Sequence, residues 1–141
     1  MVQLIVGKKG KGKTKYLLEK VNADIKEANG NIVYLDKSSK HMYELNNKIR
    51  LIDVSSFPLK NSDEFVGFIC GVISQDHDLE KMFLDSFMKL SHLEEDPEQI
   101  SGCIQQLKEI SRKFDVEFII SVSLDKEELG SDLYEDILIS L

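Results

Sequence analysis

The segment from residue 7 to residue 14 limits the folds open to this chain more than any other feature. It reads Gly-Lys-Lys-Gly-Lys-Gly-Lys-Thr and follows directly on the apolar run 2–6. Gly7 and Gly12 allow the backbone to turn so tightly that successive N–H groups point inward. A helix that begins at Lys13 would add the positive end of its dipole. The pattern therefore predicts a buried strand, a phosphate-binding loop and a helix in direct succession.

The residue types in this loop suit a polyphosphate and a divalent cation. We expect the Lys13 ammonium to reach the β- and γ-phosphates of a nucleotide, and the Thr14 hydroxyl to ligate Mg²⁺. The predicted nucleotide-binding residues are Gly7, Lys8, Lys9, Gly10, Lys11, Gly12, Lys13, Thr14 and Lys15. The sequence therefore predicts that the chain binds ATP, or another nucleoside triphosphate, together with Mg²⁺.

The distribution of charge favours a compact anionic ligand. The formal net charge is −7, yet the loop and the residue after it supply five of the 18 basic residues. The other 13 basic residues stand against 25 acidic ones. A small basic loop on an acidic body attracts a triphosphate, but it does not form the broad basic face of a duplex-binding domain. We therefore do not expect duplex nucleic acid as a partner.

Length and hydropathy fit one domain that does not insert into a membrane. The 141 residues can bury a hydrophobic core, and no linker, repeat or low-complexity tract divides them. We therefore predict a single nucleotide-binding domain over residues 1–141. No apolar run is long enough to cross a bilayer. The run 2–6 is too short for a signal peptide, so we expect a cytoplasmic protein. Cys70 and Cys103 stand alone at apolar helical positions, which indicates core residues.

Apolar periodicity predicts strands and helices in alternation. Strands are predicted at 2–6, 32–35, 49–54, 81–85 and 116–122, and the apolar run 137–141 is interpreted as a core strand or an oligomer contact. Helices are predicted from Lys13 to about Ala28, from the cap Asn61 to the loop 76–78, from Pro97 (capped by Asp96 and Gln99) to about Lys113, and from about Asp125 to Asp136. This alternation predicts a three-layer α/β/α domain with a mainly parallel sheet of about five strands.

A phosphate loop needs an acidic partner for magnesium, usually an Asp at the end of an apolar strand. Asp36, Asp53 and Asp85 fit this requirement. We favour Asp85 as the magnesium ligand and, with Lys13, as a catalytic residue. Its position leaves one more strand, 116–122, to lie between its own strand and that of the loop. Asp53 is the second choice.

These residues carry a resemblance to a known family. The loop Gly7–Thr14 with Asp85 downstream resembles the P-loop nucleoside triphosphatase superfamily, and within it the RecA-like branch, in which an extra strand separates the two motif strands. The segment Gly10–Thr14 is also similar to the phosphate loop of corrinoid adenosyltransferases. More loosely, the chain resembles small bacterial proteins named after the twitching-motility retraction ATPase. The resemblance implies a RecA-like fold and ATP binding.

One departure from the RecA-like pattern concerns hydrolysis. Members of that branch usually follow the magnesium Asp with a Glu that polarises the attacking water, whereas Ser86 follows Asp85 here. A serine hydroxyl is a poor general base at neutral pH without an activating partner. The other residues considered for contact with the water or the γ-phosphate are Glu94, Glu95, Ser121 and Ser123. Binding is therefore predicted more firmly than hydrolysis.

Three functions follow from this pattern. The first is a Mg²⁺-dependent ATPase that is slow or that depends on a protein partner or a homo-oligomer. The second is a small-molecule kinase or an adenosyl- or nucleotidyl-transferase, with the polar stretch 36–40 holding the acceptor. The scarcity of arginine speaks against it, because only Arg50 and Arg112 occur. The third is a non-catalytic interaction subunit that keeps nucleotide as a structural ligand.

The histidines and tyrosines add little to these candidates. His77 lies between Asp76 and Asp78, but consecutive loop residues rarely converge on one ion, so no metal cluster is expected there. His41 and His92 have no partner at ligand spacing. Tyr16 and Tyr34 could stack on a base, although the strand position of Tyr34 favours the core.

Overall fold

One sheet of six parallel strands organises the structure. The computed structural model describes all residues from 1 to 141. The strands are β1 (Val2–Val6), β2 (Asn31–Asp36), β3 (Arg50–Asp53), β4 (Leu79–Leu84), β5 (Glu117–Val122) and β6 (Ile137–Ser140). Their order is β3-β2-β4-β5-β1-β6, and every neighbouring pair is parallel. All strands therefore end at one edge of the sheet, here called the carboxyl edge, where the loops that follow them meet.

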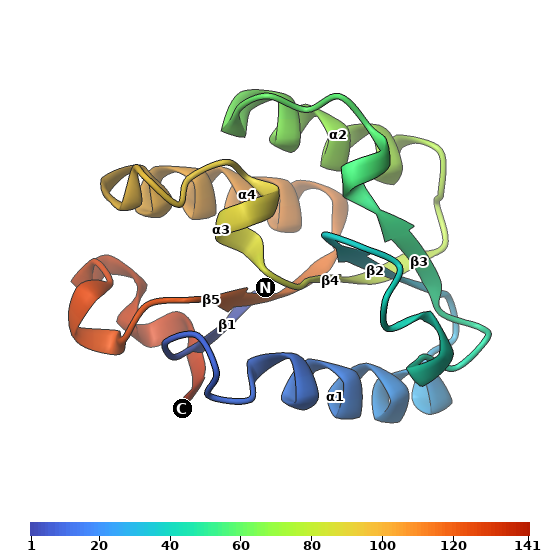
Figure 1. Ribbon diagram of the computed structural model, residues 1–141. Coiled ribbons are helices and arrows are strands. Elements are labelled where there is room, and N and C mark those ends of the chain that lie inside the picture. Colours follow the sequence, from blue (N-terminus) through green and yellow to red (C-terminus); the bar gives the residue numbers. More distant parts are fainter.

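Helices cover both faces of this sheet, so the prediction of three layers is confirmed (Figure 1). Helix α1 (Lys13–Glu27) lies on one face, whereas α2 (Ser62–Ser74) and α4 (Ile100–Phe114) lie on the other. A short helix, α3 (Phe87–Leu90), follows β4. The remaining helical turns are of the 3₁₀ type: η1 (Met42–Glu44), η2 (Val54–Ser56), η3 (Pro97–Gln99), η4 (Lys126–Glu128) and η5 (Ser131–Asp136).

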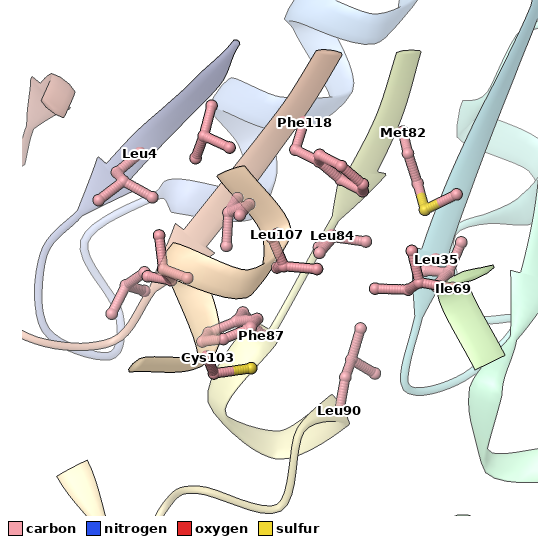
Figure 2. Packing of buried hydrophobic residues seen from close by; sticks show 14 of the residues in the cluster. Leu4, Leu35, Ile69, Met82, Leu84, Phe87, Leu90, Cys103, Leu107 and Phe118 are labelled. Carbon is pink, nitrogen blue, oxygen red and sulfur yellow. The ribbon is translucent and has the colours of Figure 1, made fainter. Parts of the chain in front are cut away.

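The two helical layers divide the apolar residues of each strand between them. Leu4 and Val6 join a cluster of 26 buried residues under α2 and α4, whereas Ile5 joins a cluster of 10 residues under α1. The larger cluster, part of which is shown in Figure 2, brings Phe118 and Met82 of the sheet together with Leu107 of α4. Successive strand residues point to opposite faces, so a strand covered on both sides needs an unbroken apolar run.

The sheet has one strand more than the predicted five or so. The additional strand is β6, which pairs in parallel with β1 at the edge of the sheet. Its side chains alternate: Ile137 and Ile139 are half-buried, whereas Leu138 is exposed. The run 137–141 is therefore an edge strand, with its apolar side chains only partly covered.

Two helix predictions are wrong: the start of the helix predicted from Pro97, and the whole helix predicted over 125–136. Asp96 makes no side-chain cap, because the Gln99 amide donates to the Asp96 backbone carbonyl at 2.9 Å and the first turn closes as 3₁₀. The α-helix itself begins at Ile100. The predicted acidic helix 125–136 is instead two 3₁₀ turns, η4 and η5. Leu129 lies between them in extended conformation and is only 5% exposed, since it packs into the larger cluster.

The predicted cap of α2 and the predicted burial of Cys103 are confirmed. The Asn61 side chain accepts a hydrogen bond from the Glu64 amide at 2.9 Å and so caps α2. Cys103 is buried in the larger cluster, and burial, with a smaller contribution from Asp63, raises the pKa of its thiol to about 11. Cys70 is only half-buried. No helix is both long enough and apolar enough to cross a bilayer.

Candidate nucleotide-binding site

The glycine-rich loop lies at the carboxyl edge, between the end of β1 and the start of α1. Gly10 and Gly12 have φ angles of +85° and +91°, a backbone region that residues other than glycine rarely adopt. Gly7 also has a positive φ, +151°, and a Cβ there would in addition lie 3.0 Å from the backbone oxygen of Leu141. The loop therefore turns into α1 with the backbone conformation that its glycines permit, and it packs against the end of β6.

Lys13 extends from the first turn of α1 back across this loop. Its side chain is 8% exposed, and its Nζ donates a hydrogen bond to the carbonyl oxygen of Lys8 at 3.0 Å. An ammonium group has three donors, so two remain for a ligand. Burial lowers the pKa of Lys13, and the Asp85 carboxylate partly offsets that effect. The single buried ammonium of the loop is thus held at its centre.

The other lysines of the predicted set differ in position. Lys9 lines the same hollow as Lys13. Lys8 instead lies 3.7 Å from both Asp125 and Glu128 across the loop. Lys11 and Lys15 are exposed. The side chains of the loop therefore divide into a pair that faces inward and others that point to solvent or to acidic neighbours.

Asp85 stands directly opposite the loop. Strand β4 ends at Leu84, so Asp85 is the first residue after it, and its side chain is only 2% exposed. Its Oδ1 accepts from the hydroxyls of Thr14 and Ser121, both at 3.2 Å, and its Oδ2 accepts from the Tyr34 hydroxyl at 2.8 Å. One carboxylate thus joins residues of α1, β2 and β5 at the carboxyl edge.

Tyr34 keeps its proton in this arrangement. Burial is the largest cause that raises its pKa, followed by the charge of Asp85 and the hydrogen bond to it. The phenol is therefore a permanent donor to Asp85. Its ring is fully buried and stacks on Phe83 at a centroid distance of 6.1 Å. The prediction that Tyr34 belongs to the core is confirmed, and such a ring is not open to a nucleotide base.

Asp53, the second choice for the magnesium ligand, forms hydrogen bonds within its own turn instead. It ends β3, which three other strands separate from β1 in the sheet order. Its Oδ1 accepts from the amide and the hydroxyl of Ser55, at 3.0 and 2.5 Å, and so closes the η2 turn. The structure therefore places Asp85, and not Asp53, beside the loop.

Asp36, the third candidate, is a buried carboxylate with one oxygen unpaired. It ends β2 and is 2% exposed. Its Oδ1 accepts from the Lys37 amide at 2.7 Å, but its Oδ2 has no hydrogen-bond partner. Burial, and then the charge of Asp85, raise the pKa of this carboxyl group. We therefore expect the ionised form of Asp36 to lower the stability of the protein at neutral pH.

Replacing Asp36 should make the protein more stable. Asp36→Asn keeps the acceptor for the Lys37 amide and removes the buried charge. We expect the free energy of unfolding to rise by about 1–3 kcal/mol at neutral pH, the penalty of a poorly paired buried charged group. Because the pKa is raised in the folded state, ionisation favours unfolding. The gain should therefore be full above the folded-state pKa and should vanish below the unfolded-state value.

Urea denaturation at several pH values, without nucleotide or Mg²⁺, measures this effect. Glu127→Gln is the control, because Glu127 is exposed and the change also removes one negative charge. A neutral-pH stability of Asp36→Asn equal to or below that of the unaltered protein would contradict the interpretation.

The loop and Asp85 enclose a polar hollow of about 280 Å³, here called the phosphate hollow. No apolar side chain lines it. The loop side contributes Lys9, Gly10, Gly12, Lys13 and Thr14. The strand ends contribute Lys37, Asp85, Ser86, Ser121 and Ser123. A hollow with three ammonium groups and one carboxylate suits a strongly anionic ligand that is accompanied by a cation.

Ser86 and Ser121 are held by each other at the floor of this hollow. The Ser86 amide donates to the Ser121 hydroxyl oxygen at 2.9 Å, and Ser86 has a φ of +59°, uncommon outside glycine. Glu94 lines a small neighbouring hollow of about 30 Å³, whereas Glu95 lines none of the hollows described here. The structure thus brings two of the considered serines to the phosphate hollow, and it leaves the nearest glutamate beside it.

The histidines do not form a metal site. No group of three or more His, Cys, Asp or Glu side chains is arranged to hold a metal ion. His41 is paired with Glu44, three residues along the chain, at 2.5 Å. His77 is exposed.

From the sequence, Lys37 is expected only within the stretch 36–40 that would hold an acceptor, and Tyr34 only in the core or against a base. Lys37 lines the phosphate hollow, and Tyr34 fixes Asp85. A signal for Tyr34 existed: strand alternation places it on the same face as Asp36, toward α1. Nothing in the sequence showed that its hydroxyl would meet Asp85, because that contact depends on the register Leu35–Leu84 between β2 and β4.

No family model and no curated protein sequence matches this chain. Among solved structures, the flagellar accessory protein FlaH from Methanocaldococcus jannaschii superposes with a TM-score of 0.55 at 12% sequence identity. The match covers 95% of this chain and 65% of FlaH, so this chain spans less than two thirds of that protein. At this identity the likeness concerns the fold. With β5 between β1 and β4, the chain has the strand order predicted for a RecA-like fold.

Proposed function

We propose that this protein binds ATP, or another nucleoside triphosphate, with Mg²⁺ in the phosphate hollow. One observation carries the proposal: Lys13 and Thr14 of the glycine-rich loop line the same hollow as Asp85, which comes from a strand far along the chain. Amides of the loop, the α1 N-terminus and the Lys13 ammonium would hold the phosphates. We assign the protein to the cytoplasm, as one nucleotide-binding domain over residues 1–141.

The side chains beside Lys13 suit Mg²⁺. The Thr14 hydroxyl donates its proton to Asp85, which leaves its lone pairs for a cation. Magnesium prefers oxygen ligands and keeps several waters, so it needs one or two protein ligands beside phosphate oxygens. Thr14 and Asp85 would therefore hold the ion, directly or through water. Bound there, Mg²⁺ would neutralise part of the phosphate charge.

Titration calorimetry with ATP, GTP and ADP, each with and without Mg²⁺, tests the proposal. We expect saturable binding of a triphosphate that is tighter when Mg²⁺ is present, because the ion and Lys13 then share the phosphate charge. The comparison of ATP with GTP also identifies the preferred base. The absence of binding for all three nucleotides in both conditions would contradict the proposal.

We further propose that hydrolysis is slow, or that it depends on a partner chain or a second copy. Ser86 follows Asp85 where the RecA-like pattern has a water-polarising glutamate. Both arginines lie away from the phosphate hollow: Arg50 begins β3 and pairs with Asp76 at 3.3 Å, and Arg112 pairs with Glu109 in the last turn of α4. An arginine that stabilises the transferred phosphate would have to come from another molecule.

Phosphate release from ATP, measured over a range of protein concentrations, tests this part. We expect little turnover in dilute protein, and a rise in turnover per molecule on self-association or on addition of a partner. Rapid turnover by dilute, monomeric protein would contradict it.

A small-molecule kinase or transferase is the second candidate. One observation favours it: Lys37, from the polar stretch 36–40 proposed to hold an acceptor, lines the phosphate hollow. An ATP-dependent product in a screen of acceptors would support this function over simple hydrolysis.

A further inference from the structure

A second hollow of about 250 Å³ lies beside the phosphate hollow at the carboxyl edge. One wall is the segment after β3, with Val54, Phe57 and Leu59. The other wall is the segment after β4, with Lys89, Leu90 and His92. Both walls therefore come from turns that follow strands, where sheets of this kind bind ligands.

The second hollow shares lining residues with its neighbours at the carboxyl edge. Lys37 lines both of them, and it also lines the small hollow of about 30 Å³. Lys89 lines the small and the second hollow, whereas Lys9 lines the small and the phosphate hollow. A ligand in the second hollow would thus lie next to the phosphate groups of a bound nucleotide.

The lining of the second hollow combines positive charge with apolar surface. Its only ionisable side chains are Lys37, Lys89 and His92, and four of its eight residues are hydrophobic. No acidic residue lines it, although the chain carries a net charge of −7. Such a lining is complementary to an anion attached to an apolar body.

Several wall residues make further contacts within the fold. Phe57 packs against Phe68 of α2 at a centroid distance of 5.2 Å. The η2 turn is closed by the hydrogen bonds from Ser55 to Asp53. Leu90 is 3% exposed and Val54 is 5% exposed. These contacts place Val54, Phe57 and Leu90 in the walls.

The β4 side of the hollow has an unusual backbone. Helix α3 is bracketed by two residues other than glycine with positive φ, Ser86 at +59° and His92 at +60°. Such residues are uncommon, and they are found where surrounding structure holds a segment in one position. This segment carries Lys89 and Leu90 into the wall.

We propose that the second hollow binds a small organic anion, a carboxylate or a phosphate monoester on a compact apolar body, next to the nucleotide phosphates. The position of the anion next to a nucleotide rests on the proposed function. The binding of the anion does not. Lys89, His92 and Lys37 hold the anionic group, and the apolar body lies against Phe57, Leu59 and Val54.

The test is a panel of small aromatic and aliphatic carboxylates and phosphate monoesters, each paired with its uncharged amide or alcohol. Binding is followed by chemical shifts of the ¹⁵N-labelled protein, with the phosphate hollow filled by a non-hydrolysable ATP analogue. We expect saturable shifts in segments 54–59 and 89–92, and about tenfold weaker binding of the uncharged partners, as for one lost charge-assisted hydrogen bond. The two arms of the panel show which anion is preferred.

Variants locate the binding. Lys89→Gln should weaken the binding of the anions about tenfold while nucleotide binding stays unchanged. Phe57→Ala should weaken the binding of the anions with the larger apolar bodies. Lys113→Gln is the control, an exposed lysine near the end of α4 that lines none of these hollows. Thermal unfolding checks that each variant folds.

The Lys13→Ala variant separates this proposal from the proposed function. Anion binding in the second hollow should persist in that variant, whether or not the unaltered protein binds ATP. The proposal is overturned if no panel member gives saturable shifts in the two segments, if charged and uncharged partners bind equally, or if the shifts fall in residues 8–14 and disappear in Lys13→Ala.

Discussion

Lys13→Ala is expected to weaken ATP binding by at least about 100-fold and to leave the fold intact. The ammonium is the one buried cation of the loop, and two of its three donors are available to phosphate oxygens. Two charge-assisted hydrogen bonds, each worth about 1.5–3 kcal/mol, account for a loss of this size. The only protein hydrogen bond that disappears is the one to the Lys8 carbonyl, so stability should change by about 1 kcal/mol or less.

Calorimetry with ATP and Mg²⁺ gives the affinity, and thermal unfolding gives the stability. Lys26→Ala is the matched control, because Lys26 is an exposed lysine in the last turn of the same helix. Equal ATP affinities for Lys13→Ala and Lys26→Ala would remove the assignment of Lys13.

Asp85→Asn is expected to abolish most of the effect of Mg²⁺ on nucleotide affinity. The substitution keeps the shape of the side chain and removes the charge that would attract the cation. Hydroxyl groups can rotate to donate or accept, so Tyr34 and Ser121 can adapt to the new amide. We therefore expect affinity for ATP without Mg²⁺ to be kept or raised, and the gain on adding Mg²⁺ to fall about tenfold or more.

Asp53→Asn is the comparison for this prediction. Asp53 was the other carboxylate favoured from the sequence, and its side chain closes the η2 turn away from the loop. Magnesium titrations at fixed ATP should distinguish the two variants. A larger loss of magnesium dependence in Asp53→Asn than in Asp85→Asn would move the metal role to Asp53.

The loop was accessible to sequence reasoning because its geometry is local. A strand, a glycine-rich turn and a helix start occupy neighbouring residues, so the pattern 2–14 determines their arrangement. The choice of Asp85 required one more step, the expectation that strand 116–122 lies between the two motif strands, and the sheet order β4-β5-β1 confirms that expectation.

What could not be predicted depends on contacts between distant segments. The hydrogen bonds of Asp85 to Tyr34 and Ser121 require the registers of β2, β4 and β5 to agree, and no local pattern encodes a register. The unpaired oxygen of Asp36 is of the same kind. The helix prediction for the segment 125–136 was wrong for another reason. Burial of Leu129 in an extended conformation outweighs the helical preference of its acidic pattern.

The contact between Gly7 and Leu141 gives the sixth strand an indirect influence over the loop. The Leu141 amide donates to the Val6 carbonyl at 2.8 Å, one residue before the glycine-rich turn begins. Substitutions in β6, outside the phosphate hollow, should therefore move the end of β1 from which the glycine-rich turn begins. Such substitutions should change the affinity for the ligand although every binding residue is unchanged.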